Sequence, residues 1–291
     1  MNQINQMVVN QEIETKTEVK PIEDVTLLQT QAHSSRTEKY QVVRTSEIIN
    51  AFVNKGYTWE LVKKTKARKQ SKKGYEAHMI YFEKQSLSLG DETLDQEVKP
   101  RIYLRNSHDG TTVCEFTIGL FRFVCENGLF IGTMFDSIKL KHIGSVQERV
   151  DQAIAKMEQE YESNIGAKVR TLKETVLTNE QINAYAETML RQRMRNSPSF
   201  MHGEHEMLLK VNPNRVKEDS GNSAWSVIQR VQDNLGLNFG RSPVELTCYH
   251  SGLDKDNKEV IKERKLRRIS SIKEVTELNQ FVFKAMEDII K

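Results

Sequence analysis

Short segments in which apolar and polar residues alternate dominate the chain between positions 57 and 144. Alternation with a period of two is typical of strands that bury one face, so each segment predicts a strand of an antiparallel sheet. The expected strands are residues 57–65, 75–84, 101–108, 111–119, 121–125, 129–132 and 137–144.

Tight turns are expected between these segments. Asp109-Gly110 separates two of them, and this pair suits the positive backbone angles of a short hairpin turn. Glu126-Asn127-Gly128 interrupts the most apolar stretch in a similar way, because Asn and Gly tolerate the left-handed conformation. The pattern therefore predicts an antiparallel meander, and its first hairpin carries a lysine-rich tip.

Helical periodicity follows this sheet, apart from one short amphipathic segment that precedes it. Three of the later segments begin with Ser or Thr three residues before Glu or Gln, which is the pattern of a capping box. The expected helix starts are Thr45 or Ser46, Ser145, Thr178, Ser223 and Ser271, and the expected stops include Gly56 and Gly236.

The order of these elements predicts an α+β protein, with an antiparallel β-meander sheet followed by and packed against helices. Residues 1–37 are rich in polar side chains, and we expect a disordered tail there because little apolar surface offsets the chain entropy. Residues 38–164 should form the sheet with flanking helices, and residues 165–291 a mainly helical C-terminal half of the same body.

The composition of the 291-residue chain suits a soluble globular protein, with 37% hydrophobic and 29% charged residues. No apolar run approaches the ~18 residues that a membrane-spanning helix needs, and the N-terminus lacks the features of a signal peptide. Cys114, Cys125 and Cys248 are widely spaced and predict packed free thiols. We therefore expect a protein of the reducing cytoplasm, without a membrane partner.

Charge is unevenly distributed, although the net charge is only +3. The segment Val62–Lys73 contains seven basic residues and no acidic one. Smaller basic clusters occur at Arg191, Arg193 and Arg195, and from Lys262 to Arg268. Like charges repel one another, and this repulsion falls when a polyanion such as nucleic acid approaches. A solubilising loop is the alternative explanation for the lysine-rich tip.

Arginines in the predicted strands extend this candidate site. Arg122 alternates with Phe121 and Phe123, so it projects to the opposite face of the sheet. A partly buried guanidinium needs an anionic partner, either a phosphate or, as the rival explanation, Glu115 or Glu126. The candidate nucleic-acid-binding residues are Lys63, Lys64, Lys66, Arg68, Lys69, Lys72, Lys73, Arg101, Arg105 and Arg122. The rings expected to stack on bases nearby are Tyr57, Trp59, Tyr75 and Tyr81.

Histidines offer few candidates for catalysis or metal binding. His202 and His205 do not have the spacing of HExxH, and no Cys or Asp pair completes a ligand set, so we expect no metal there. His108 and His142 lie at strand ends, where each could act as an acid or base. Together with Asp109 they support a nuclease or hydrolase only as an alternative, and no cofactor is expected.

Several segments carry a resemblance to a known family. They are NSHDG, GLFRFVCENGL and KHIG in the predicted sheet, WSVIQRVQDNL in a helix, and RRISSIKEVTELNQFVF near the end of the chain. From about Tyr40 to Lys291 the chain resembles the family of domain of unknown function 932, found in prophages, plasmids and phage genomes. It departs from the family pattern at Gln229 and Asp233. The resemblance implies a mobile-element origin and supplies no settled activity.

These observations predict a non-enzymatic nucleic-acid-binding protein of a phage or related element in a bacterial cytoplasm. We favour single-stranded DNA and a role in recombination or replication, because a meander followed by a long helix resembles single-strand annealing proteins. Such proteins form rings or filaments, so we expect a homo-oligomer. One alternative is an interaction protein that inhibits a host defence enzyme, and the other is a metal-dependent nuclease.

Overall fold

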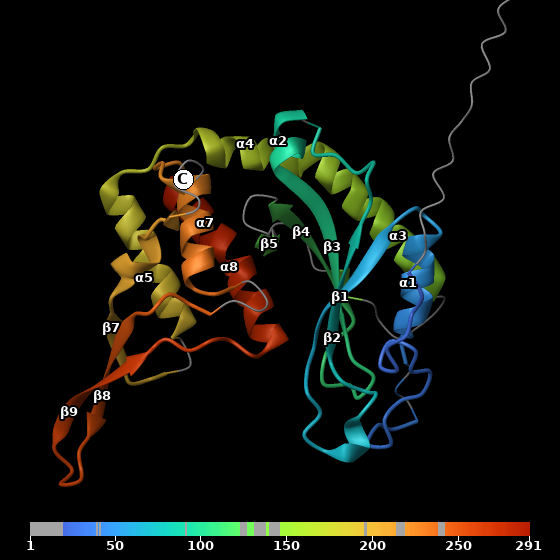
Figure 1. Ribbon diagram of the computed structural model, residues 1–291, viewed down its shortest axis with the longest axis horizontal. Coiled ribbons are helices and arrows are strands. Elements are labelled where there is room, and N and C mark those ends of the chain that lie inside the picture. The colour runs from blue at the N-terminus through green and yellow to red at the C-terminus, as the bar shows by residue number, and fades with distance from the viewer. Residues whose placement is uncertain are drawn as a thin grey trace, which may run out of the picture.

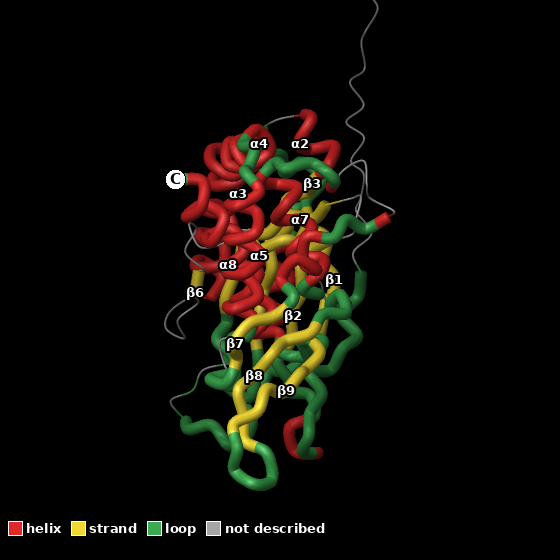
Figure 2. The backbone as a smooth tube through the Cα atoms, turned by 90° about the vertical axis from the view of Figure 1, so that its left-hand side faces the viewer, coloured by secondary structure: helices red, strands yellow, loops and turns green. Residues whose placement is uncertain are grey.

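The protein folds into two β-sheets that are connected and covered by helices (Figure 1). The computed structural model describes residues 20–38, 40, 42–90, 92–122, 127–130, 138–139, 146–194, 197–213, 219–237 and 242–291. The larger sheet lies on one side of the molecule, and a bundle of helices with the smaller sheet lies on the other (Figure 1). The hairpin ends of both sheets extend toward the same end of the molecule (Figures 1 and 2).

The larger sheet is antiparallel, with the order β1-β2-β3-β4-β5 and with β6 paired to β4. Its strands are β1 (Thr58–Lys64), β2 (His78–Glu83), β3 (Val98–Asn106), β4 (Glu115–Arg122), β5 (Asn127–Phe130) and β6 (Ile138–Lys139). The predicted α+β class and antiparallel sheet are therefore confirmed. The sheet is not a simple meander, because β6 pairs with β4 instead of β5: Ile138 lies opposite Phe116, and Lys139 lies opposite Glu115.

The register between β4 and β5 corrects one predicted turn. Arg122 pairs with Asn127, and Phe121 pairs with Gly128. Asn127 and Gly128 therefore belong to a strand, and the expectation that they form the turn is wrong. The pairing requires the connection to fall at residues 123–126, which lie outside the described part of the chain.

Helices α1 (Thr45–Val53) and α3 (Val146–Glu160) cover one face of the larger sheet (Figure 1). Phe52 of α1 stacks on Phe82 of β2 with ring centroids 3.7 Å apart, and its centroid lies 5.6 Å from that of Phe116 in β4. All three rings are buried. Aromatic side chains bury large apolar areas, so this cluster anchors the helix to the sheet.

Two local expectations near this sheet are wrong. Thr45 does not cap α1, because its hydroxyl is bonded to a buried histidine of β2. The acidic residues from Gly90 to Glu97, followed by Pro100, predict a loop, but a short helix, α2 (Glu92–Glu97), forms there and Pro100 lies within β3. Asp95 of α2 accepts hydrogen bonds from the Ser88 hydroxyl and the Leu89 amide, which ties the helix to the preceding loop.

A helical connection joins the two halves of the molecule. It comprises α3, a π-helical turn η2 (Tyr161–Ile165) and α4 (Gly166–Glu174). Tyr161 is fully buried, and its hydroxyl lies 3.0 Å from the amide nitrogen and 2.8 Å from the carbonyl oxygen of Gly119. It also donates to the carbonyl oxygen of Arg101. One phenol thus ties the connection to both β3 and β4.

Removing this hydroxyl in Tyr161→Phe should lower the free energy of unfolding by about 2 kcal/mol, because buried backbone groups of Gly119 and Arg101 lose a partner. Urea unfolding followed by circular dichroism measures the change. Tyr249→Phe is the control, because the Tyr249 hydroxyl makes no hydrogen bond within the described ranges. Equal effects of the two substitutions would contradict this role of Tyr161.

The C-terminal half contains α5 (Asn179–Arg193), the 3-10 turn η3 (His205–Leu209), α7 (Ala224–Asn234) and α8 (Ile272–Ile290). The predicted capping box of α5 is confirmed, since Thr178 Oγ1 accepts from the Gln181 amide at 3.2 Å and Gln181 Oε1 accepts from the Thr178 amide at 3.0 Å. Ser271 caps α8 by accepting from the Glu274 amide. Ser145 lies outside the described residues.

The smaller sheet was not expected from the sequence pattern. Its strands are β7 (Phe200–Gly203), β8 (Thr247–Leu253) and β9 (Glu259–Lys265), in the order β7-β8-β9. Every residue of β9 except Val260 is exposed, so the strand lacks the alternation that marks a half-buried strand. The C-terminal half therefore combines helices with a projecting β-hairpin.

Residues 20–38 lie against the hairpin formed by β1 and β2. Leu27 is fully buried, the Thr26 hydroxyl donates to Glu76 at 3.0 Å, and the His33 amide donates to the carbonyl oxygen of His108 at 3.1 Å. The expectation of a disordered tail is therefore wrong for residues 20–37, because these few contacts hold a segment of otherwise polar composition. Residues 1–19 lie outside the described part.

Candidate nucleic-acid interface

The connection between β1 and β2, residues 65–77, is called the basic tip. Lys66, Arg68, Lys69 and Lys73 are exposed there, and none of the four forms an ion pair with another described residue. The first three line a hollow of about 370 Å³, and its other charged lining residues are Lys72, Glu76 and Asp109. The basic tip therefore presents several cations to solvent without neutralising partners.

Two other candidate lysines are neutralised by the fold. Lys64 Nζ lies 2.6 Å from Asp24 Oδ2, and Lys72 Nζ lies 2.9 Å from Asp109 Oδ2. Burial pushes the pKa of Asp109 upward, but hydrogen bonds from Thr111 and Lys72 outweigh it and hold the pKa below its ordinary value. Asp109 is therefore a charged partner that fixes Lys72 in place.

Arg101 and Arg105 do not line an open backbone groove. Arg101 Nε donates to Glu83 at 2.7 Å, and its guanidinium lies 3.8 Å from the centre of the Tyr81 ring. Arg105 Nη2 donates to Glu115 at 2.6 Å, and the two arginine side chains are only 12% and 15% exposed. The expectation that they contact phosphates is corrected, because carboxylates on neighbouring strands already neutralise them.

Arg122 ends β4, and its side chain lies outside the described part of the structure, as do residues Cys125, Glu126 and His142. Glu115, one of the two carboxylates considered as its partner, is engaged by Arg105.

The aromatic rings near the basic tip belong to the fold. Tyr57 and Trp59 are buried, with 2% and 8% exposure. Tyr75 packs edge-on against His33 with ring centroids 5.1 Å apart, and Tyr81 lies beneath an arginine. The expectation that rings stack on bases is therefore wrong for the buried Tyr57 and Trp59, whereas the tip keeps four exposed cations.

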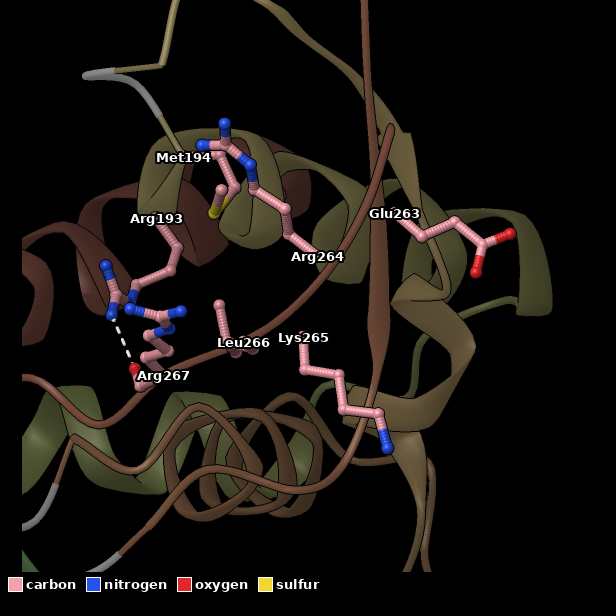
Figure 3. Close-up of a pocket in the computed structure, with 7 residues that line it drawn as sticks. All are labelled: Arg193, Met194, Glu263, Arg264, Lys265, Leu266 and Arg267. Carbon is pink, nitrogen blue, oxygen red and sulfur yellow. Dashed lines mark hydrogen bonds between the residues drawn. The ribbon is translucent and has the colours of Figure 1, made fainter. Parts of the chain in front are cut away.

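A second cationic cluster, called the arginine hollow, consists of Arg193, Arg264 and Arg267 (Figure 3). The two basic segments that the sequence shows, around Arg193 and from Lys262 to Arg268, meet in this hollow. Arg193 ends α5, and its Nη2 donates to the carbonyl oxygen of Arg267 at 2.9 Å. The signal that could have found this site is the pair of basic clusters itself.

Behind the basic tip, a buried hydrogen-bond network joins Thr45, His78, Asn106 and His108. His78 Nδ1 donates to the carbonyl oxygen of Glu76 at 2.9 Å, so its Nε2 accepts from the Thr45 hydroxyl at 2.8 Å. The Thr45 oxygen accepts in turn from Asn106 Nδ2 at 3.0 Å and from His108 Nε2 at 3.3 Å. Burial lowers the pKa of both histidines to about 4, so both are neutral at pH 7.

This network gives His108 a structural role, because the residue has no exposed surface. Among the described residues, no three His, Cys, Asp or Glu side chains come together as a metal site. His202 stacks on Tyr249 with ring centroids 4.7 Å apart. Cys114 and Cys248 are buried free thiols, in agreement with the sequence prediction. None of the helices in the described ranges is both long and apolar enough to cross a bilayer.

Comparison with known proteins identifies relatives by sequence. The family model for domain of unknown function 932 (DUF932) matches residues 32–251. Two proteins of Escherichia coli strain K12, UPF0380 protein YafZ and UPF0380 protein YfjQ, are each 26% identical to this chain over 207 residues. Each alignment covers 70% of this chain and 70% of the relative. No solved structure matches the chain significantly.

Proposed function

The chain belongs to the family of domain of unknown function 932, and we propose that it is a nucleic-acid-binding protein of a phage or related mobile element. It binds single-stranded DNA without catalysing a reaction, and it acts in recombination or replication within a bacterial cytoplasm. Several copies assemble along one strand, as the annealing activity of such proteins requires.

The observation that carries this proposal is the set of exposed cations at the basic tip. Lys66, Arg68, Lys69 and Lys73 lie within one short connection and have no ion-pair partners among the described residues. Bringing phosphates to such a cluster releases counterions from the nucleic acid, and this release supplies binding free energy. Since the nearby aromatic rings are packed against other residues of the protein, the basic tip contacts the phosphates of the nucleic acid rather than its bases.

Fluorescence anisotropy with a labelled single-stranded oligonucleotide tests the proposal. The logarithm of affinity should fall linearly with the logarithm of salt concentration, with a slope of about −0.7 per phosphate contacted. Reversing the four tip cations in Lys66→Glu, Arg68→Glu, Lys69→Glu and Lys73→Glu should weaken binding at least tenfold. A competition with duplex DNA and RNA of the same length measures the preference for single-stranded DNA.

A matched control separates the position of the charges from the net charge. Lys255, Lys258, Lys273 and Lys291 are exposed elsewhere on the molecule, and reversing them changes the net charge equally. We expect this control to lose little affinity. Equal losses in the two quadruple variants, or no binding by the original protein, would refute the role of the basic tip.

A second candidate function is an interaction protein that inhibits a host defence enzyme. It is favoured by an apolar patch on the smaller sheet, where Met201 of β7, Leu253 of β8 and Ile261 of β9 are 42%, 51% and 62% exposed. These three side chains surround a hollow of about 460 Å³. If the second candidate is right, a pull-down from nuclease-treated host lysate should still capture a host protein. The double substitution Leu253→Asp/Ile261→Asp should abolish that capture.

A further inference from the structure

The arginine hollow lies where the end of α5 meets strand β9 and the residues that follow it (Figure 3). Its volume is about 730 Å³, which is within the range of small-ligand pockets. Arg193, Arg264 and Arg267 lie on the side of β9 that faces α5, whereas Glu263 and Lys265 point away from it (Figure 3). Arg264 thus enters the hollow from β9, whereas Arg193 comes from the end of α5 and Arg267 from the residues that follow β9.

The charges in this hollow are not balanced. Arg193 Nη1 lies 2.7 Å from Glu274 Oε1, and Arg193 Nε is buried with no hydrogen-bond partner in the described part of the chain. The side chains of Arg264 and Arg267 form no ion pair or hydrogen bond with other described residues. Among the described residues, the three guanidinium groups therefore have one ion-pair partner, Glu274, although Glu263 also lines the hollow.

A structural role accounts for only part of this arrangement. A cation is stabilised at the C-terminal end of a helix, and this explains Arg193 at the end of α5. Arg264 and Arg267 are exposed and lie outside the helices. The positive charge of Arg264 also affects His250, because burial and the charge of Arg264 together lower the pKa of this histidine. An anion bound in the hollow would relieve this repulsion.

We propose that the arginine hollow binds phosphate groups of the same single strand that the basic tip binds. This assignment rests on the proposed function. Guanidinium groups form paired hydrogen bonds with phosphate oxygens, which makes arginine well suited to this contact. The hollow has room for a phosphate together with part of its nucleotide.

Arg268, which follows the arginine hollow in the sequence, lies close to a lysine of β1, the strand that leads into the basic tip. The pKa of Lys63 in β1 is lowered by burial and by the positive charge of Arg268, so these residues lie near each other. Figure 1 shows the chain after β9 running toward the larger sheet before α8 begins. A strand bound at the basic tip can therefore pass Lys63 and Arg268 on its way to the arginine hollow.

Binding of a labelled oligonucleotide by Arg264→Glu/Arg267→Glu tests this inference. We expect at least a tenfold loss of affinity, and a salt dependence that is shallower by about 1.4, corresponding to about 0.7 for each of two phosphates. Lys255→Glu/Lys258→Glu changes the net charge equally at the exposed β8–β9 turn and should bind normally. Unaltered thermal unfolding of both variants would show that the folds are intact.

Titration with inorganic tripolyphosphate, followed by calorimetry, separates this inference from the proposed function. Tripolyphosphate should bind the original protein, and Arg264→Ala/Arg267→Ala should weaken that binding at least tenfold. If tripolyphosphate binds in this way but no oligonucleotide does, the hollow is an anion site and the proposed function is wrong. If oligonucleotide binding depends on the basic tip but neither ligand is affected by the arginine substitutions, the inference is wrong and the proposed function stands.

Discussion

Acidification from pH 7 to pH 5 should lower the free energy of unfolding by about 4 kcal/mol, shared between His78 and His108. Burial lowers the pKa of each histidine from 6.5 to about 4, and for His108 the neighbouring His78 adds to this effect. Between about pH 6.5 and pH 4, these two histidines therefore bind protons in the unfolded chain but stay neutral in the folded protein. This part of the stability is fully present above about pH 6.5 and is lost as the pH falls toward 4.

Urea unfolding at several pH values between 7 and 5, followed by the fluorescence of the buried Trp59 and Trp225, measures this dependence. His108→Gln removes one titrating group and should make the pH dependence shallower, whatever it does to stability at pH 7. His202→Gln is the control, because His202 is exposed. A slope that is the same in His108→Gln and the original protein would show that His108 does not titrate as described.

Gly166→Ala should lower the free energy of unfolding by about 3 kcal/mol. A Cβ atom at this position would lie 2.0 Å from the carbonyl oxygen of Leu89 and 3.2 Å from its carbonyl carbon. These are backbone atoms, and the amide of Leu89 is already held by Asp95 at 2.8 Å. The start of α4 or the loop before α2 must therefore move to accept the methyl group.

Gly221→Ala provides the matched control, because its Cβ atom would find its nearest neighbour at 3.8 Å, an ordinary contact. This substitution should change the free energy of unfolding by less than about 0.5 kcal/mol. Thermal unfolding followed by circular dichroism compares the stability of the two variants with that of the original protein. A tolerated Gly166→Ala would show that the helical connection does not depend on this close approach.

Elements of the fold with strong local signals could be predicted from the sequence. The strands on either side of Asp109-Gly110 alternate clearly, and Gly110 has the expected positive φ of 68°. Thr178 and Gln181 form the predicted capping box. Strand β9 could not be predicted in this way, because exposure on both faces removes the hydrophobic period. Residues 20–37 carry little sign of order in their sequence, because Leu27 is buried whereas Val25 and Leu28 remain exposed.

The candidate site was only partly predictable. The lysine-rich composition of the basic tip is a local feature and can be read directly. Whether a cation is neutralised depends instead on its neighbours in space, as Arg101 with Glu83 shows. For Arg105 a signal existed, since a hairpin centred on Gly110 places Glu115 opposite it. The sequence shows both basic clusters, but the meeting of Arg193 with Arg267 depends on the packing of α5 against a segment that is distant in the chain.

The contacts of residues 20–38 also determine when this segment can fold during translation. Thr26 and His33 leave the ribosome early, but their partners Glu76 and His108 are made later. At ordinary rates of synthesis the delay is on the order of 10 seconds. Residues 20–38 therefore cannot complete these contacts until the strands that follow them have been made, and until then the segment is open to chaperones and proteases.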